Sequence, residues 1–184
     1  MSAVAPRNRV CGSCSLCCKL FEVGELIKPR DTWCRHVVFG KGCGIHPDWP
    51  KTCNDFFCLW RDERIAAALP DDVRPDKCGV VLTAAHGGTA IVAVCRPETP
   101  FAWRDNEQIF RFLHAAVSSG ANVSIRAGKS YFILGRRGYL EVPKQYVNGN
   151  MDGTGEFEVK IPEAVRRSLG IGPEAAGASA ALHN

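Results

Sequence analysis

The stretch CGSCSLCC, residues 11–18, places four cysteines within eight residues, and the last two of them are adjacent. Such a group can form disulfides, work as a redox pair or bind a metal. The other cysteines narrow the choice, because they too are concentrated near the N-terminus. The N-terminal set is Cys11, Cys14, Cys17, Cys18, Cys34, Cys43, Cys53 and Cys58, and only Cys78 and Cys95 lie beyond it. Cysteines used as small apolar side chains would be scattered, so the concentration indicates a shared chemical role.

Length and composition indicate an ordinary globular protein. The chain has 184 residues, of which 46% are hydrophobic and 23% charged, enough for one core or one core with a small satellite. A net charge of +4 is too weak to predict nucleic-acid binding. The first ten residues lack the apolar run of a signal peptide, and the internal apolar stretches are too short to span a bilayer. We therefore expect a cytoplasmic protein with no membrane partner.

A cytoplasmic location favours metal ligation, because cytosolic thiols are kept reduced and clustered cysteines there more often bind metal than form disulfides. Structural zinc sites usually use two separated C-x2-C pairs. This chain instead has one triple, C-x2-C-x2-C, which is similar to the compact part of a ferredoxin-type iron–sulfur motif. The pattern favours iron or an iron–sulfur cluster, and Zn²⁺ is the alternative because eight thiolates also suffice for two zinc ions.

The adjacent cysteines are expected to have different roles. On a helix, about 100° per residue would bring Cys11, Cys14 and Cys18 onto one stripe and turn Cys17 to the side. In an extended chain, Cys17 and Cys18 would point to opposite faces. Gly12 favours an irregular start, so we expect a turn that winds into a helix. Either geometry predicts that Cys17 and Cys18 are not equivalent ligands, with Cys18 the one that joins Cys11 and Cys14.

The cysteine pattern resembles that of the CxxCxxCC family of zinc- or iron-chelating domains, whose cysteine module is also associated with flagellin lysine-methylating enzymes. The family pattern has an opening quartet, a lone cysteine, Cys-x-Ile-aromatic, a proline and a closing Cys-x4-Cys. Here CGSCSLCC, Cys34 and GCGIHPDWPKTCNDFFC match it at every cysteine, while His46 replaces the aromatic residue and Trp49 replaces an arginine. The resemblance covers roughly the first third of the chain and implies metal binding by all eight N-terminal cysteines.

The changes in residue composition and apolar periodicity along the sequence predict an α+β fold in three parts. Residues 1–78 form a cysteine-rich, metal-stabilised module with a helix over residues 51–69, ended by Pro70. Residues 79–161 form a small β-β-α-β-β domain, an antiparallel sheet covered on one face by a helix over residues 105–120. Its strands are GVVLTA, TAIVAVC, NVSIRA, KSYFILG, GYLEV and EFEVKI. Residues 162–184 form a short helix, stopped by Gly170, and a flexible tail.

Two classes of function follow from these observations. The first is a non-catalytic binding or accessory module that holds the metal and docks to a protein partner. The second is a metal-dependent enzyme, such as a methylase-like protein-modifying enzyme or a redox enzyme. No glycine-rich nucleotide motif is present. Cys78 and Cys95 lie in or beside apolar runs and are expected in the core, and His36 and His46 are expected outside the ligand set.

Overall fold

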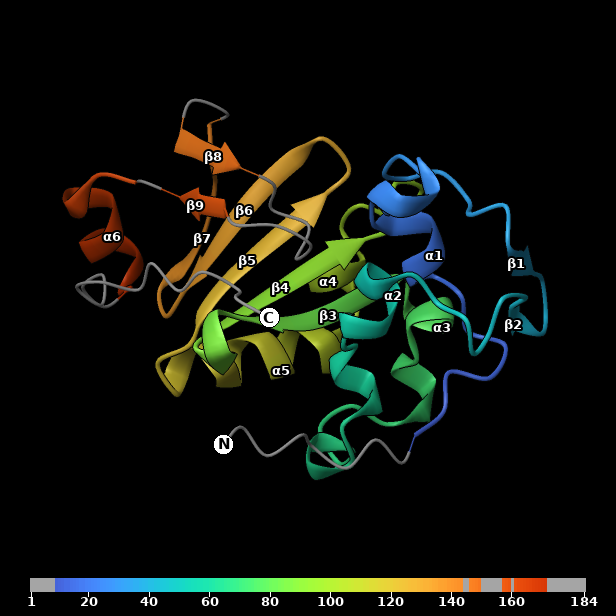
Figure 1. The fold of residues 1–184 in the computed structure, drawn as a ribbon. Coiled ribbons are helices and arrows are strands. Elements are labelled where there is room, and N and C mark those ends of the chain that lie inside the picture. Colours follow the sequence, from blue (N-terminus) through green and yellow to red (C-terminus); the bar gives the residue numbers. More distant parts are fainter. Residues whose placement is uncertain (1–8, 144–145, 150–156, 160, 172–184) are drawn as a thin grey trace.

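A five-stranded sheet forms the centre of the protein, and the α+β class is confirmed (Figure 1). The structure is a computed structural model, and it describes residues 9–143, 146–149, 157–159 and 161–171. The strand order is β3-β4-β5-β6-β7. The strands are β3 (Val80–Ala85), β4 (Ala90–Cys95), β5 (Asn122–Ala127), β6 (Ser130–Gly135) and β7 (Gly138–Glu141).

The sheet is mixed, where the sequence predicted an antiparallel one. β4 and β5 run parallel. In the sequence, α4 (Ala102–Asp105) and α5 (Glu107–Ser118) lie between them and bring the chain back to the end of the sheet at which β4 begins. The predicted strand EFEVKI also lies elsewhere. Its central residues form β9 (Phe157–Val159), which pairs with β8 (Val147–Gly149) in a separate ribbon.

The helix predicted over residues 105–120 is confirmed as α5. The side chain of Asn106 caps it and accepts a hydrogen bond from the backbone N–H of Ile109 at 3.0 Å. The helix stops at Gly120, whose φ of +94° lies in the left-handed region that glycine adopts easily. The expected apolar stripe is buried, with Ile109 and Leu113 almost fully enclosed.

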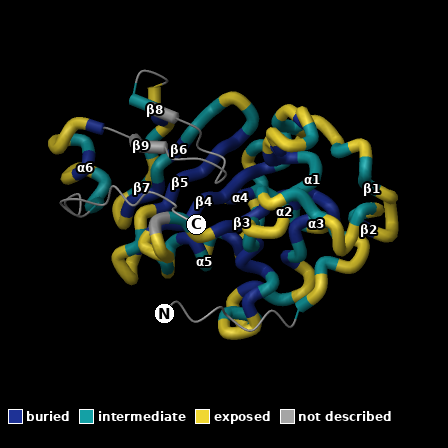
Figure 2. Tube along the Cα trace, viewed as in Figure 1, coloured by how far each residue is buried: buried dark blue, intermediate teal, exposed yellow. Residues whose placement is uncertain are grey.

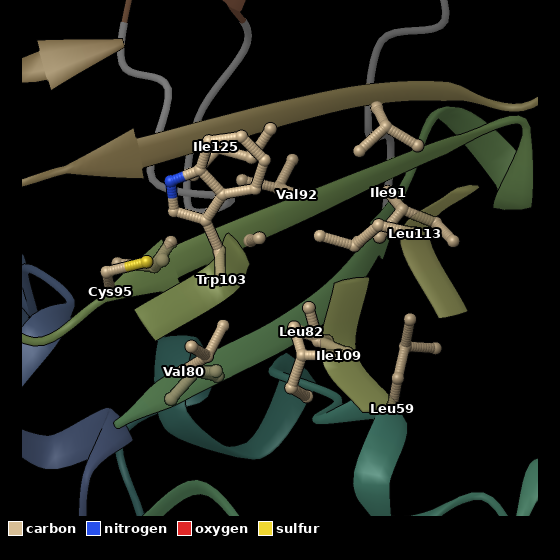
Figure 3. Packing of buried hydrophobic residues seen from close by; sticks show 14 of the residues in the cluster. Leu59, Val80, Leu82, Ile91, Val92, Cys95, Trp103, Ile109, Leu113 and Ile125 are labelled. Atoms are coloured by element: carbon tan, nitrogen blue, oxygen red, sulfur yellow. The ribbon is translucent and has the colours of Figure 1, made fainter. Parts of the chain in front are cut away.

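One face of the sheet, termed the helix face, packs against α4 and α5. Side chains alternate along each strand, so Val80 and Leu82 point to the same face as Ile125. Trp103 from α4, together with Ile109 and Leu113 from α5, fills the space over this face (Figure 3). This half of the protein is an ordinary apolar sandwich of helix on sheet.

The opposite face, termed the cysteine face, is covered by the cysteine-rich segment near the ends of β4 and β5 (Figure 1). The Thr83 hydroxyl donates a hydrogen bond to the carbonyl of Phe57 at 3.0 Å, and Arg126 donates one to the carbonyl of Leu20 at 2.9 Å. β4 and most of β5 are thus buried on both faces, which explains the continuous apolar run of β4 (Figure 2). The segment contributes Leu16, Leu20, Phe21, Leu59 and Trp60 to the same core as the sheet.

The single helix predicted over residues 51–69 is wrong. α2 (Lys51–Asp55) ends at Phe56, whose backbone is extended, because Cys58 leaves the helix to form a bridge with Thr83. Two 3₁₀ turns follow, η2 (Leu59–Arg61) and η3 (Glu63–Ile65). The remaining elements of this segment are α1 (Cys17–Leu20), η1 (Gly24–Leu26), β1 (Val37–Val38), β2 (Gly42–Cys43), η4 (Asp71–Val73) and α3 (Pro75–Cys78).

At the C-terminal end, the predicted short helix is present as α6 (Glu163–Leu169), and Gly170 ends it in the left-handed conformation. The predicted flexible tail falls on residues 172–184, which lie outside the described residues. Among the helices that the structure describes, none has the length and apolarity needed to cross a membrane.

Candidate metal-binding site

The opening quartet forms a turn followed by a short helix, as expected. Gly12, with φ +54°, turns the chain so that the N–H of Cys14 donates to the carbonyl of Cys11 at 2.9 Å. α1 begins only at Cys17. The angular spacing of a helix therefore does not apply from Cys11 onward, which corrects the expected grouping of Cys18 with Cys11 and Cys14.

Four of the eight predicted ligands surround one small cavity. It measures about 20 Å³, room for about one water-sized sphere. Its lining residues are Cys11, Cys14, Cys17, Cys58, Trp60, Arg61, Pro75 and Val81. We call these four cysteines the cavity set. Cys17 belongs to it and Cys18 does not, although the thiols of Cys17 and Cys18 hydrogen-bond to each other.

The cavity set is anchored to the core of the protein. Cys58 is held by its bridge to Thr83 on β3, and Val81 of the same strand lines the cavity. Trp60 is buried and its indole N–H donates to the carbonyl of Pro70 at 3.2 Å. The sulfurs are therefore presented by a packed part of the structure.

Burial dominates the electrostatics of these thiols. It raises the pKa of Cys14 to about 11 and that of Cys58 to about 12, since a thiolate is costly to bury. The pKa of Cys11 is also raised by burial, against the opposing charges of Arg61 and Arg74. These thiols are neutral at physiological pH, so a metal ion that binds here displaces protons from them.

The other four predicted ligands form a second group, termed the outer set: Cys18, Cys34, Cys43 and Cys53. The N–H of Cys34 donates to the carbonyl of Cys18 at 3.1 Å, which joins the first two. The pKa of Cys53 is raised to about 11, by burial first and then by the charges of Cys18, Cys34 and Cys43. The charges of Cys18, Cys34 and Cys43 act on Cys53, and none of the four cysteines lines the cavity.

A buried lysine lies beside the outer set. Lys28 is 6% exposed, and burial lowers its pKa against the opposing charges of Cys18 and Cys34. The pKa of Cys18 is lowered to about 7, first by the hydrogen bond with Cys17 and further by the charge of Lys28. The three carbonyls that accept from the Lys28 ammonium belong to Lys19, Phe21 and Pro29. Sequence reasoning missed this residue, because nothing local marks a lysine as buried.

Cys78, Cys95, His36 and His46 do not line the cavity. Cys95 is fully buried in the core as expected, while Cys78 is half-buried and donates to the carbonyl of Val73 at 3.3 Å. His36 accepts a hydrogen bond from Arg35. His46 is exposed and packs edge-on against Trp49, with ring centroids 4.5 Å apart.

The thiols of each set lie near one another without forming a finished coordination sphere. Among the described residues, no group of three or more His, Cys, Asp or Glu side chains is arranged to hold a metal ion. The chemistry of the donors nevertheless fits one, because thiolates select zinc, iron and other soft metals. No family model, curated protein or solved structure matches the chain. The residues themselves must therefore carry the argument for function.

Proposed function

We propose that this protein binds iron or zinc through its N-terminal cysteines and acts as a non-catalytic binding or accessory module. The observation that carries the proposal is the convergence of Cys11, Cys14, Cys17 and Cys58 on one cavity. Four thiolates are the usual ligand set of a structural zinc ion and also hold iron. The match of all eight N-terminal cysteines to the CxxCxxCC pattern supports the same function.

The size of the cavity favours a single ion. A volume of about 20 Å³ holds about one water-sized sphere. An iron–sulfur cluster adds inorganic sulfide to its iron atoms and needs the four side chains to move apart. A mononuclear iron or zinc centre needs the same side chains to turn toward one shared ion.

The surroundings of the cavity favour a non-catalytic role. A catalytic metal keeps one position open for water or substrate, with three protein ligands. Here four thiols are available, and the other lining residues are Trp60, Arg61, Pro75 and Val81. No carboxylate or histidine is among the residues that line the cavity, although the Asp76 carboxylate hydrogen-bonds to the Cys14 thiol from outside it. A methylase-like or redox enzyme is the alternative.

The test is purification without oxygen, followed by metal and acid-labile sulfide analysis. We expect at least one equivalent of iron or zinc per chain without sulfide, and a clear loss of metal in Cys11→Ser and Cys14→Ser. Cys78→Ser is the matched control, because Cys78 is half-buried and lies outside both sets. Protein with less than one equivalent of iron and zinc together would overturn the proposal. Iron with matching sulfide would replace the single ion with a cluster.

A further inference from the structure

The β1–β2 hairpin carries apolar side chains that the core does not use. Trp33, Val38 and Phe39 are all exposed, and Phe39 is the most exposed of them at 69%. Phe39 lies in the turn that the N–H of Lys41 closes on the carbonyl of Val38 at 2.9 Å. Tight turns favour Gly, Asn, Asp, Ser and Pro. An aromatic ring at the tip of this hairpin therefore needs an explanation outside the fold.

The hairpin is held in place by the rest of the cysteine-rich segment. It packs against the opening turn, since a Cβ at Gly42 would lie 2.7 Å from the carbonyl oxygen of Gly12. The rings of Trp33 and Phe39 meet edge to face, with centroids 5.0 Å apart. Figure 1 shows the hairpin at one edge of the molecule, away from the sheet. The rings are thus ordered before any partner binds, which lowers the entropy cost of binding.

The charge around these apolar side chains is positive. Residues 32–47 contain no aspartate or glutamate, and Arg35 and Lys41 are both exposed. The nearest carboxylate before this stretch, Asp31, is used in an ion pair with an arginine of the sheet. The nearest one after it is Asp48. A surface that complements the hairpin is therefore acidic as well as apolar.

A protein fits the hairpin better than other occupants do. A second copy that met it tip to tip would bring Arg35 and Lys41 against the same cations. Nucleic acid binds by stacking bases on ring faces, but the Lys19 ammonium already lies over the Trp33 ring, 5.6 Å from its centroid. A lipid surface needs a larger apolar area than this tip offers. Trp and Arg are among the residue types that contribute most to protein–protein binding.

The five residues concerned, termed the hairpin patch, are Trp33, Arg35, Val38, Phe39 and Lys41. We propose that the hairpin patch is the docking surface for a protein partner that presents an apolar depression surrounded by acidic side chains. Phe39 enters the depression, and the two cations pair with carboxylates at its rim. The inference deepens the accessory role proposed above and rests on that role in taking a protein as the occupant.

The experiment selects short random peptides, displayed on phage, against the full-length protein purified without oxygen, and discards those that also bind Phe39→Ser. We expect the recovered peptides to combine Asp or Glu with an apolar residue. A synthesised peptide of this kind, followed by fluorescence anisotropy, should bind about 10-fold or more weakly to Phe39→Ser, and more weakly as salt is added. Lys41→Glu should also weaken it. Lys129→Glu is the matched control, because it makes the same charge change at the exposed β5–β6 turn.

Several results would overturn the inference. They are recovered peptides without acidic residues, binding that salt does not weaken, and the absence of any peptide that distinguishes the wild type from Phe39→Ser. Two further probes test the other occupants: vesicles of phosphatidylserine with phosphatidylcholine, and a single-stranded oligonucleotide. Binding of either probe that is lost in Phe39→Ser would assign the patch to a membrane or a nucleic acid instead. Dimerisation in sedimentation that is lost in the same variant would assign it to a second copy.

Metal analysis of the same samples separates this inference from the proposed function. The wild type and Phe39→Ser should hold the same amount of metal. Selective peptide binding by a wild-type chain without metal would overturn the metal centre and leave the docking surface standing, and metal without any selective peptide would do the reverse. If Phe39→Ser loses metal, Lys41→Glu replaces it as the variant for selection and measurement. Unchanged peptide affinity in Lys41→Glu would then overturn the inference.

Discussion

The two faces of the central sheet are covered in different ways. The helix face carries α5, whose buried stripe of Ile109 and Leu113 packs on the strands like many small α+β proteins. The cysteine face carries short helices, 3₁₀ turns and a two-residue hairpin, which are tied down by a few anchors such as Trp60 and Arg126. The apolar side of a regular helix is enough to hold α5 on the helix face. The cysteine-rich segment has little regular secondary structure and needs cross-links, which we propose are metal ions.

Metal removal should therefore affect the two faces very differently. After chelation, residues 11–58 should lose amide protection by orders of magnitude, because metal-binding free energy is folding free energy in such segments. The strands of the sheet and α5 should keep slow exchange, since their helix-face packing is unchanged. Hydrogen exchange followed by mass spectrometry measures both regions at once. Unchanged protection in residues 11–58, or loss across the whole chain, would break the comparison.

A cavity made by mutation on the helix face should lower the free energy of unfolding without changing the metal content. Leu113 is fully buried, so Leu113→Ala should lower the free energy of unfolding by about 3 kcal/mol. The metal content should equal that of the wild type. Arg111→Ala, on the exposed side of the same helix, is the control and should change stability by about 0.5 kcal/mol or less. Metal loss in Leu113→Ala would show that the two covers depend on each other more than their contacts suggest.

The ion pair between Arg126 and Asp31 should be the next largest anchor of the cysteine face. Arg126 is 2% exposed and reaches Asp31 and the carbonyl of Leu20. Arg126→Met should cost about 2 to 3 kcal/mol, somewhat less than a fully buried pair, because the Asp31 side chain is 32% exposed. Unfolding by denaturant measures this change in the free energy of unfolding. Arg104→Met, which removes an arginine from a surface pair, should have little effect.

The smallest effect should come from Asp62, which caps η3. Hydrogen bonds from Arg64 lower its pKa, so it stabilises the fold above its unfolded pKa of about 3.9 and loses that effect as the pH falls through its folded pKa. Asp62→Asn should cost about 1 kcal/mol at pH 7, since Arg64 is mostly exposed. The difference from the wild type should vanish near pH 2. A difference independent of pH would show that the carboxylate charge is irrelevant.

The sequence predicted the helix face better than the cysteine face, for a physical reason. The helix over residues 105–120 and the strands GVVLTA and TAIVAVC are local patterns, and all three are confirmed. The parallel pairing of β4 with β5 is not local, and it was missed. The prediction of one helix over residues 51–69 was wrong because Cys58 forms a bridge with Thr83, which is distant in the sequence.

The candidate site shows the same limit. Clustering of the cysteines is visible in the sequence, and so is the difference between Cys17 and Cys18. Their assignment to two sets depends on where α1 begins, at Cys17, and on which strand lies beneath it. The helical spacing from Cys11 gave the opposite assignment. Lys28 has no local signal, because its burial results from the folding of distant segments around it.

X-ray absorption at the metal edge of the anaerobically purified protein tests whether metal thiolates hold the cysteine face. We expect iron or zinc with a first shell of about four sulfurs, at about 2.3 Å if the ion is zinc, and no metal–metal distance. A first shell dominated by nitrogen or oxygen would contradict it, as would protein that carries neither metal. A short iron–iron distance would contradict the single ions and indicate a cluster.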